Sequence, residues 1–339
     1  INVADNKVSE QSTQETDSTN QKTYEIQNAR HLYNIRFAEI VSDAAVYAAD
    51  ADEKSGNNYV ITKDFAWGYE ESDESAGESI LKKGMVYRSG LSVADADTAF
   101  PMITQLREGS SLGSFDADEI HTISYLTMSD AANAGTGSSN RFYPQGTGTA
   151  LILENLGEIH DLSLYHASVN GGEYVATFCA YNGGKLANLE TEGGTITAQN
   201  CAGGIFAASL PMKPVEDGAL IKLINHATVT AEGMSAGIVA ESSEPLVLAD
   251  CVNTGVITGN IAAGITTAEN EELTLIGCQN YGVILSDEDE SYGITSNQIA
   301  MLTDCVGVSD PTYPIAADAT KIENCWYFVS GEETLNQVL

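Results

Sequence analysis

The chain is short of basic residues, of proline and of long apolar runs, and these shortages exclude several classes of protein. Its 339 residues contain 15 Lys and Arg against 48 Asp and Glu, which gives a formal net charge of −33. Such a surface repels nucleic acid and anionic lipid, because phosphate binding needs clustered cations. The sequence has no run of about 18 apolar residues, the length needed to cross a bilayer. We therefore expect no nucleic-acid partner and no direct membrane insertion.

Patterns typical of transition-metal and nucleophile sites are also missing. There is no Cys-x-x-Cys pair, and the histidines lack the spacing of zinc ligands. The five histidines are His31, His121, His160, His166 and His226. The string Gly233-Met-Ser-Ala-Gly237 matches the nucleophile elbow G-x-S-x-G, but that elbow leads into a helix and Ile238-Val-Ala predicts a strand. We interpret Ser235 as an ordinary turn residue.

The chain is instead rich in glycine and carries an internal repeat. Gly numbers 31 against 7 Pro, which fits many tight turns between short strands. Three segments of the C-terminal half can be superimposed on Cys251, Cys278 and Cys305, which are 27 and again 27 residues apart. A period of this length is typical of a solenoid, in which each repeat is one coil stacked on the last.

The repeat predicts an all-β fold, a right-handed parallel β-helix of about six or seven coils. Each coil is expected to carry about three short strands, with equivalent residues stacked about 4.8 Å apart. Inward positions then form apolar ladders, and the corners need Gly or Asn, which tolerate left-handed backbone angles. The predicted ladders are Cys251, Cys278 and Cys305; Asn225, Asn253 and Asn280; and Gly204, Gly237, Gly264 and Gly293. The asparagine side-chain amides are expected to stack and to bond neighbouring coils.

Two states of the cysteine ladder are compatible with its spacing. Adjacent coils bring stacked cysteines within the Cα separation of a disulfide. Stacked side chains point the same way, however, and three in a row cannot all pair. We favour buried reduced thiols that pack as small apolar groups.

Composition divides the chain into four parts. Residues 1–23 are polar, contain too few large apolar groups to fold, and predict a disordered linker. Residues 24–148 predict an N-terminal capping region and irregular first coils, including a short amphipathic helix with Asn28 as its N-cap. Residues 149–330 predict the regular coils of the β-helix, and residues 331–339 a C-terminal tail.

Several of these segments resemble the GLUG-repeat proteins of bacterial cell surfaces. Gly255-Val-Ile-Thr-Gly followed by Ala263-Gly-Ile is similar to their Gly-x-Ile-x-Gly element and the Gly-Gly-Ile that follows it. Asn155-Leu-Gly-Glu-Ile-His-Asp-Leu resembles another of their coils. The resemblance covers about residues 24–330, and such domains occur in adhesin-like proteins and beside peptidase domains that cleave immunoglobulin A. It implies an extracellular, non-catalytic module at the bacterial cell surface or wall, monomeric within a larger protein.

The resemblance leaves three functions to compare. We expect an adhesin-like module that binds a host or microbial ligand, glycan or protein, through its variable turns. The first alternative is an inert stalk that presents another domain. The second is a polysaccharide lyase or hydrolase of the β-helix type, but lyase chemistry needs a basic residue beside an acidic sugar and hydrolysis needs paired carboxylates on one face. The regular coils show neither pattern.

One variable turn supplies the candidate binding residues. These are Tyr281, Asp287, Glu288, Asp289, Glu290 and Tyr292. The two tyrosines flank the acidic turn and predict a modest glycan-contacting surface. The four carboxylates are the ligand type that Ca²⁺ prefers, but the turn follows no EF-hand or nonapeptide pattern. We favour a loop tip that is exposed to solvent and binds no metal. Ca²⁺ binding is the alternative, and we expect no other cofactor.

Overall fold

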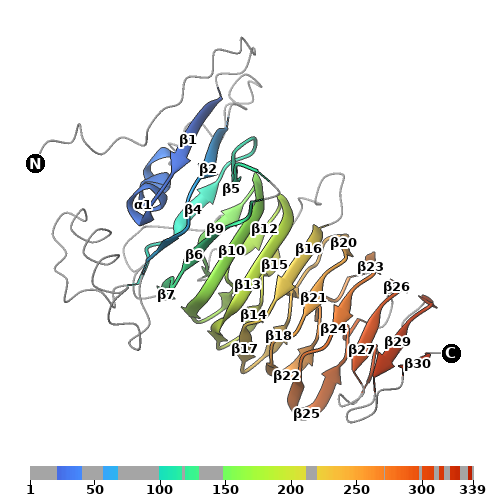
Figure 1. Cartoon of the computed structure of the whole chain (residues 1–339). Helices are drawn as coiled ribbons and strands as arrows, with labels where there is room; N and C mark the ends of the chain where they lie inside the picture. Colours follow the sequence, from blue (N-terminus) through green and yellow to red (C-terminus); the bar gives the residue numbers. More distant parts are fainter. Residues whose placement is uncertain are drawn as a thin grey trace, which may run out of the picture.

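The computed structural model describes residues 21–39, 56–67, 99–116, 119–129, 148–210, 220–270, 272–297, 300–308, 313–316, 321–328 and 335–337. Within these residues the chain is a parallel β-helix. One wrapped sheet contains 25 strands and a second contains five. Figure 1 shows the coils following one another along a single axis, from the blue N-terminal strands to the red C-terminal ones. The predicted all-β solenoid is confirmed.

The coil has five sides, which we number in chain order from its first strand. The first side stacks β1 (Lys22–Ile26), β2 (Asn57–Ile61), β5 (Ser111–Ser114), β10 (Glu158–Asn170), β13 (Lys185–Ala198), β16 (Leu220–Asn225), β20 (Leu246–Ala249), β23 (Leu273–Ile276), β26 (Met301–Thr303) and β28 (Lys321–Glu323). These are ten rungs, more than the six or seven coils predicted. The difference arises because the N-terminal capping region itself contributes β1, β2 and β5 to the stack.

The other four sides are built in the same way, and long strands such as β10 and β13 continue around the corners. The second side adds β3 (Phe65–Ala66), β6 (His121–Ser124), β21 (Val252–Asn253), β24 (Gln279–Asn280), β27 (Val306–Val308) and β29 (Trp326–Phe328). The third adds β7 (Thr127–Ser129), β17 (Thr228–Ala231), β22 (Ile257–Ala263) and β25 (Ile284–Tyr292). The fourth adds β8 (Gly148–Thr149), β11 (Tyr174–Val175), β14 (Cys201–Gly203) and β18 (Met234–Ala236).

The fifth side is the separate sheet, and one strand closes the C-terminal end. The fifth side stacks β4 (Ile103–Leu106), β9 (Ile152–Asn155), β12 (Cys179–Asn182), β15 (Phe206–Ser209) and β19 (Val239–Glu241), all parallel. At the last coil, β30 (Leu335–Gln337) pairs antiparallel with β29.

A single left-handed residue makes the corner between the first and second sides in seven successive coils. These residues, with φ between 48° and 63°, are Asp161, Asn188, Lys222, Asp250, Gly277, Asp304 and Asn324. One such residue turns the chain while strand pairing continues on both sides of it, as in the unbroken β13. The expected three strands per coil are therefore too few, since a single residue turns each of these corners and only one of the seven, Gly277, is a glycine.

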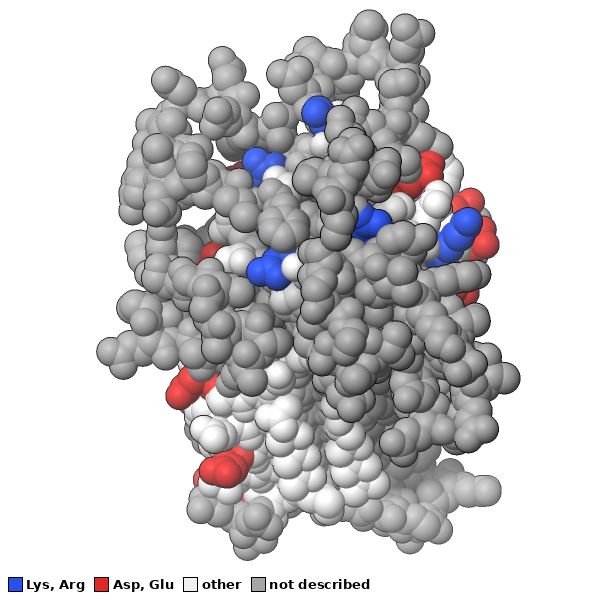
Figure 2. Space-filling model, turned by 90° about the vertical axis from the view of Figure 1, so that its left-hand side faces the viewer, with Lys and Arg blue, Asp and Glu red and all other residues white. Residues whose placement is uncertain are grey.

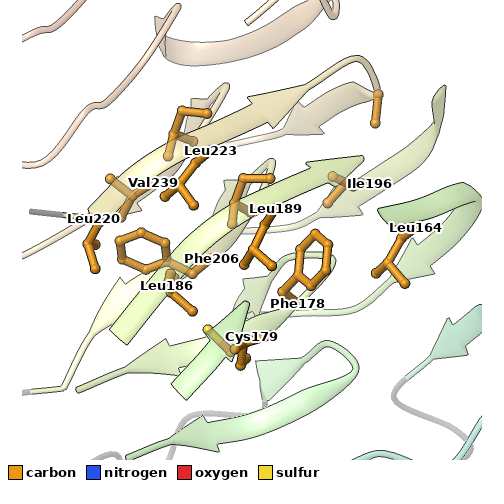
Figure 3. Packing of buried hydrophobic residues seen from close by; sticks show 14 of the residues in the cluster. Leu164, Phe178, Cys179, Leu186, Leu189, Ile196, Phe206, Leu220, Leu223 and Val239 are labelled. Carbon is orange, nitrogen blue, oxygen red and sulfur yellow. The ribbon is translucent and has the colours of Figure 1, made fainter. Parts of the chain in front are cut away.

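The interior is a column of apolar side chains that runs the length of the stack. One buried cluster extends from Ile26 to Cys325. Figure 3 shows Leu164, Phe178, Leu189 and Phe206 within this cluster, between the ribbons of opposite sides. Each coil exposes an apolar face that only the next coil can cover, so stacking in register supplies most of the hydrophobic stabilisation.

The predicted asparagine and glycine ladders form one structure on the inside of the stack. Asn225, Asn253 and Asn280 are fully buried, and each side-chain amide donates to the next at 2.8 Å. A Cβ on Gly264 would lie 2.4 Å from Cγ of Asn280, so the glycines leave the space that the amides fill. The predicted bonding of side-chain amides between coils is confirmed. The expected left-handed angles are wrong, because neither the asparagines nor the glycines of the two ladders have a positive φ.

The cysteine ladder continues one rung further than predicted. Cys251, Cys278, Cys305 and Cys325 are all buried, and the six cysteines of the chain are free thiols in the structure. Hydrogen bonding to Cys278, together with burial, raises the pKa of Cys305 to about 12. Cys305 is therefore protonated near neutral pH, and the four buried side chains of the ladder pack as part of the core.

The N-terminal end is closed by the predicted helix. Helix α1 spans Ala29–Ala38, and Oδ1 of Asn28 accepts from the backbone N–H groups of Arg30 and His31, both at 3.0 Å, as expected of an N-cap. Strand β1 begins at Lys22, so it includes the last two residues of the predicted linker. The described residues contain no helix long and apolar enough to cross a membrane.

A buried carboxylate ties the end of α1 to the first coils. Glu39 is 3% exposed and accepts hydrogen bonds from Nε of Arg107 at 3.0 Å, from the hydroxyl of Tyr59 at 2.5 Å and from Ser110. Burial alone would raise the pKa of Glu39, but the bonds from Arg107 and Tyr59 outweigh it and lower that pKa. The carboxylate is thus held ionised.

Candidate functional site

The two predicted aromatic residues occupy different environments. Tyr281 is 48% exposed and its ring centre lies 6.1 Å from that of Phe328. Tyr292 is only 8% exposed, because it stacks on Tyr313 with ring centres 5.0 Å apart. Tyr281 therefore remains available to a ligand, whereas Tyr292 is mainly part of the packing between coils.

The acidic turn is a bulge within one strand. Asp287, Glu288 and Asp289 lie in β25, where the register with β22 shifts between Gly259 and Ile261. The structure does not describe the side chains of these three residues. Glu290 is exposed, and its backbone N–H donates to Ser286 Oγ at 3.2 Å. No cluster of three or more potential metal ligands occurs among the described residues, so Ca²⁺ binding at this turn stays a prediction.

The serine of the elbow-like string is not placed as a nucleophile. Ser235 lies in β18, is fully buried, and its hydroxyl has no hydrogen-bond partner among the described residues. The following segment Val239–Glu241 is strand β19 and not a helix. The interpretation of Ser235 as structural agrees with this geometry.

A histidine at the corner between the second and third sides joins three coils. Nδ1 of His226 is 2.5 Å from Oγ1 of Thr254, and its Nε2 is 3.0 Å from Oε1 of Glu190. A hydroxyl, an imidazole and a carboxylate follow one another in this order in the catalytic triad of a hydrolase. The His226 side chain is 36% exposed and that of Glu190 34%, whereas such chemistry depends on a site that excludes water. We therefore assign the trio to the surface hydrogen bonds that link coils.

A polar hollow lies elsewhere, at the corner between the fifth and first sides of the first coils. It is a groove of about 330 Å³. It is lined by Gln21, Asn58, Glu108, Gly109, Ser110, Ser111, Leu156, Gly157, Glu158, His160, Gly183, Gly184 and Lys185. The pairings of β2, β5, β10 and β13 place Asn58, Ser111, Glu158 and Lys185 in one row across four coils.

A second asparagine ladder builds the floor of this groove. Nδ2 of Asn155 donates to Oδ1 of Asn182 at 2.7 Å, and each asparagine accepts from the backbone N–H two residues later, at Gly157 and Gly184. A Cβ on Gly184 would lie 2.1 Å from the carbonyl oxygen of Gly157, so only glycine lets the coils approach at this corner. The absence of side chains on the two glycines leaves the hollow.

Hydrogen-bonding groups dominate the wall of the groove. Glu108 and Glu158 bring carboxylates, Lys185 an ammonium group and His160 an imidazole whose Nδ1 is 2.8 Å from Asp161. Oδ1 of Asn58 accepts from Gln21 and from Ser111, both at 2.9 Å, so its orientation is fixed. Such a wall matches a neutral polar ligand that donates and accepts several hydrogen bonds.

The sequence interpretation missed this groove, although a signal for it was present. The string Asn-x-Gly occurs at Asn155 and Asn182 as well as at Asn253 and Asn280, so it marks two different corners of the coil. Glu108 gave no such signal, because it reaches the groove from a connection that precedes the regular coils.

Comparison with known proteins supports the fold. No protein-family model and no curated protein matches the chain. A solved structure from Bacteroides ovatus, described as a "putative immunoglobulin A1 protease", is similar with a TM-score of 0.51 and 15% sequence identity. The similarity covers 94% of this chain and 80% of that one. At this identity the likeness shows that the two chains share the β-helix fold.

Proposed function

We propose that this protein is a non-catalytic, extracellular, adhesin-like module of a bacterial surface protein that binds a neutral glycan in the groove of its first coils. The observation that carries the proposal is the groove itself, in which a rigid corner presents polar side chains from four coils. The resemblance of the repeats to GLUG-repeat surface proteins supports the exported location and the larger parent protein.

The chemistry of the groove favours a neutral sugar over other ligands. Its two carboxylates and the net charge of −33 disfavour phosphates and acidic sugars, while carboxylates, amides and backbone groups suit sugar hydroxyls. A volume of about 330 Å³ lies at the lower end of small-ligand pockets, which suits one or two sugar units.

Binding at a single groove is expected to be weak. No Phe, Tyr or Trp belongs to the described residues that line it, so the stacking that strengthens many sugar sites is missing. Several modules on one cell surface would raise the apparent affinity through multivalency. Weak single-site binding is therefore consistent with an adhesive role.

One observation favours a catalytic alternative. Glu108 and Glu158 line the same groove, and a pair of carboxylates is what glycoside hydrolysis requires. If the protein is a hydrolase, incubation with neutral oligosaccharides will release reducing ends, and Glu108→Gln will abolish the release. If it is a binding module, no reducing ends will appear and Glu108→Gln will only weaken binding.

An array of neutral oligosaccharides tests the proposal. Wild-type protein is expected to bind a subset of the glycans, and Ser111→Trp, which puts a large side chain into the row that lines the groove, is expected to abolish that binding. Glu232→Gln is the matched control, because Glu232 is exposed at a distant corner of a later coil. Failure of the wild-type protein to bind any glycan would favour the inert stalk, and retention of binding by Ser111→Trp would place the site elsewhere.

A further inference from the structure

An exposed aromatic residue, Phe115, lies close to the groove. At 81% it is the most exposed of the large apolar residues that the structure describes. Phe115 directly follows β5, and the alternation of side chains along that strand places Ser111, Gly113 and Phe115 on its outer face. Ser111 lines the groove, so the row of outward residues that starts in the groove ends at an aromatic ring.

The turn that carries Phe115 is pinned at its base. Asp116 and Glu119 form an antiparallel bridge, and the backbone N–H of Glu119 donates to the carbonyl oxygen of Asp116 at 3.0 Å. Oγ of Ser114 accepts from the backbone N–H of His121 at 2.8 Å. These bonds close the turn on both sides of Phe115, so the ring is presented from a fixed position.

Hydrogen-bonding groups connect the groove to Phe115. His160 lines the groove, and its Nδ1 is 2.8 Å from Oδ2 of Asp161. Oδ1 of Asp161 in turn accepts from Nδ2 of Asn188 at 2.6 Å. A Cβ on Gly113 would lie 2.7 Å from Nδ1 of His160, so the imidazole lies over Gly113, two residues before Phe115. The polar wall of the groove therefore reaches the turn that carries the ring.

A second aromatic group lies further along β10, at the corner between the second and third sides. It consists of Tyr125, Tyr165 and His166, here called the aromatic corner. The ring centres of Tyr165 and His166 are 4.3 Å apart, and those of Tyr125 and Tyr165 are 5.6 Å apart. Glu192 pairs with Tyr165 in the next coil, and its carboxylate accepts from Ser163 at 2.5 Å. Rings beside a fixed carboxylate offer both an apolar face and a hydrogen-bond acceptor.

The backbone of the aromatic corner is strained. Tyr125 has φ 55°, a left-handed angle at which a bulky residue is an outlier. His166 has φ 50° at the same corner of the next coil, and the coil after that has Gly193 there with φ 71°. Glycine adopts this angle without cost. Because strained residues of this kind cluster at binding sites, the aromatic side chains at this corner point to a ligand.

The charges along this path are of both signs. At the corner between the first and second sides, Lys63 is exposed beside the acidic residues Asp64, Asp116 and Glu119. Five of the eight Lys and Arg residues that the structure describes lie between residues 21 and 129. Figure 2 shows Lys and Arg beside Asp and Glu at this end of the molecule. Such a mixed surface favours neither an anion nor a cation, and its donors and acceptors suit sugar hydroxyls.

We propose that Phe115 and the aromatic corner bind a linear neutral glycan chain that extends from the groove along β10, an inference that rests on the proposed function. From His160 to Tyr165 the strand advances five residues, which is at most about 16 Å because the corner at Asp161 bends the path. The groove itself suits one or two sugar units. The preferred ligand is therefore an oligosaccharide of several units, whose outer sugars stack on Phe115 and Tyr165.

The probes are the disaccharide and the hexasaccharide of neutral glucose, mannose and xylose series, and calorimetry measures their affinities. Wild-type protein is expected to bind the hexasaccharide of at least one series about tenfold or more tightly than its disaccharide. Phe115→Ala and Tyr165→Ala are each expected to weaken hexasaccharide binding about threefold or more, with no change for the disaccharide. Tyr165→Phe keeps the ring and is expected to bind as the wild type does.

The matched control is Tyr281→Ala, which removes an aromatic residue that is 48% exposed on the C-terminal coils. It is expected to change the affinity for neither probe. The extension alone is overturned if both lengths bind equally well and Ser111→Trp abolishes their binding, or if Tyr281→Ala weakens hexasaccharide binding as much as Phe115→Ala does. Absence of binding to both lengths in every series would overturn the groove as a glycan site together with its extension.

Discussion

Replacing the central residue of the buried asparagine ladder, Asn253→Ala, tests how the coils are held in register. Asn253 takes part in four hydrogen bonds: it donates to Asn280 and Gly255, and it accepts from Asn225 and Gly255. The substitution removes all four and leaves the buried N–H of Gly255 without this partner. At about 1 kcal/mol for each bond, with the unsatisfied group in addition, the loss of unfolding free energy is about 4 kcal/mol or more.

The ends of the ladder provide a graded comparison. Asn280 takes part in three such bonds, with Asn253 and with the N–H and C=O of Gly282, so Asn280→Ala is expected to cost about 1 kcal/mol less than Asn253→Ala. A double-mutant cycle on this adjacent pair is expected to show a coupling of at least about 0.5 kcal/mol, because the two substitutions remove one shared bond. Asn225 and Asn280 share no bond and are expected to be additive.

Urea unfolding followed by circular dichroism measures these free energies, provided that the transition is reversible and single. The reasoning is refuted if Asn253→Ala costs less than about 1 kcal/mol, the value of one hydrogen bond. It is also refuted if the adjacent pair is additive, because the amides would then not be bonded between coils.

Three further predictions concern the core and the N-terminal cap. Gly264→Ala is expected to destabilise the protein by several kcal/mol, because the new Cβ would lie 2.2 Å from the carbonyl oxygen of Gly293 and 2.4 Å from Cγ of Asn280. A melting temperature equal to that of the wild type would contradict this close contact. Folding lowers the pKa of Glu39 below its ordinary 4.5, so its stabilisation is present above that pH and is lost as the pH falls through the folded value. The stability difference between wild type and Glu39→Gln should therefore shrink below about pH 4.5, and a difference independent of pH would be inconsistent with an ionised Glu39. The six buried thiols are expected to resist alkylation in the native state and to react fully in denaturant, as mass spectrometry would show; rapid labelling of any one would disprove its burial.

The sequence carried enough information for the fold because the repeat is periodic in both spacing and residue type. Cys251, Cys278 and Cys305 fixed the register, and Asn28 fixed the start of the helix. The number of sides per coil was underestimated because corners such as Asn188 and Asp250 are single left-handed residues within continuous pairing. The number of rungs was underestimated because β1, β2 and β5 belong to no visible repeat.

The candidate site was less predictable, because a surface depends on contacts between residues far apart in the sequence. Tyr292 resembles Tyr281 in its sequence surroundings, but Tyr313 covers it. The groove joins Asn58, Glu108 and Glu158, which reach one corner only after the capping region has stacked on the regular coils. Pattern analysis within single coils does not bring such residues together.

The most direct test of the proposed function is an NMR titration of isotope-labelled protein with a neutral glycan that binds on the array. The account predicts that the backbone amide signals of Gly109, Gly157 and Gly184 shift, and that they no longer shift in the Ser111→Trp variant. Shifts confined to Tyr281 and residues 287–290, with the groove glycines unaffected, would contradict it.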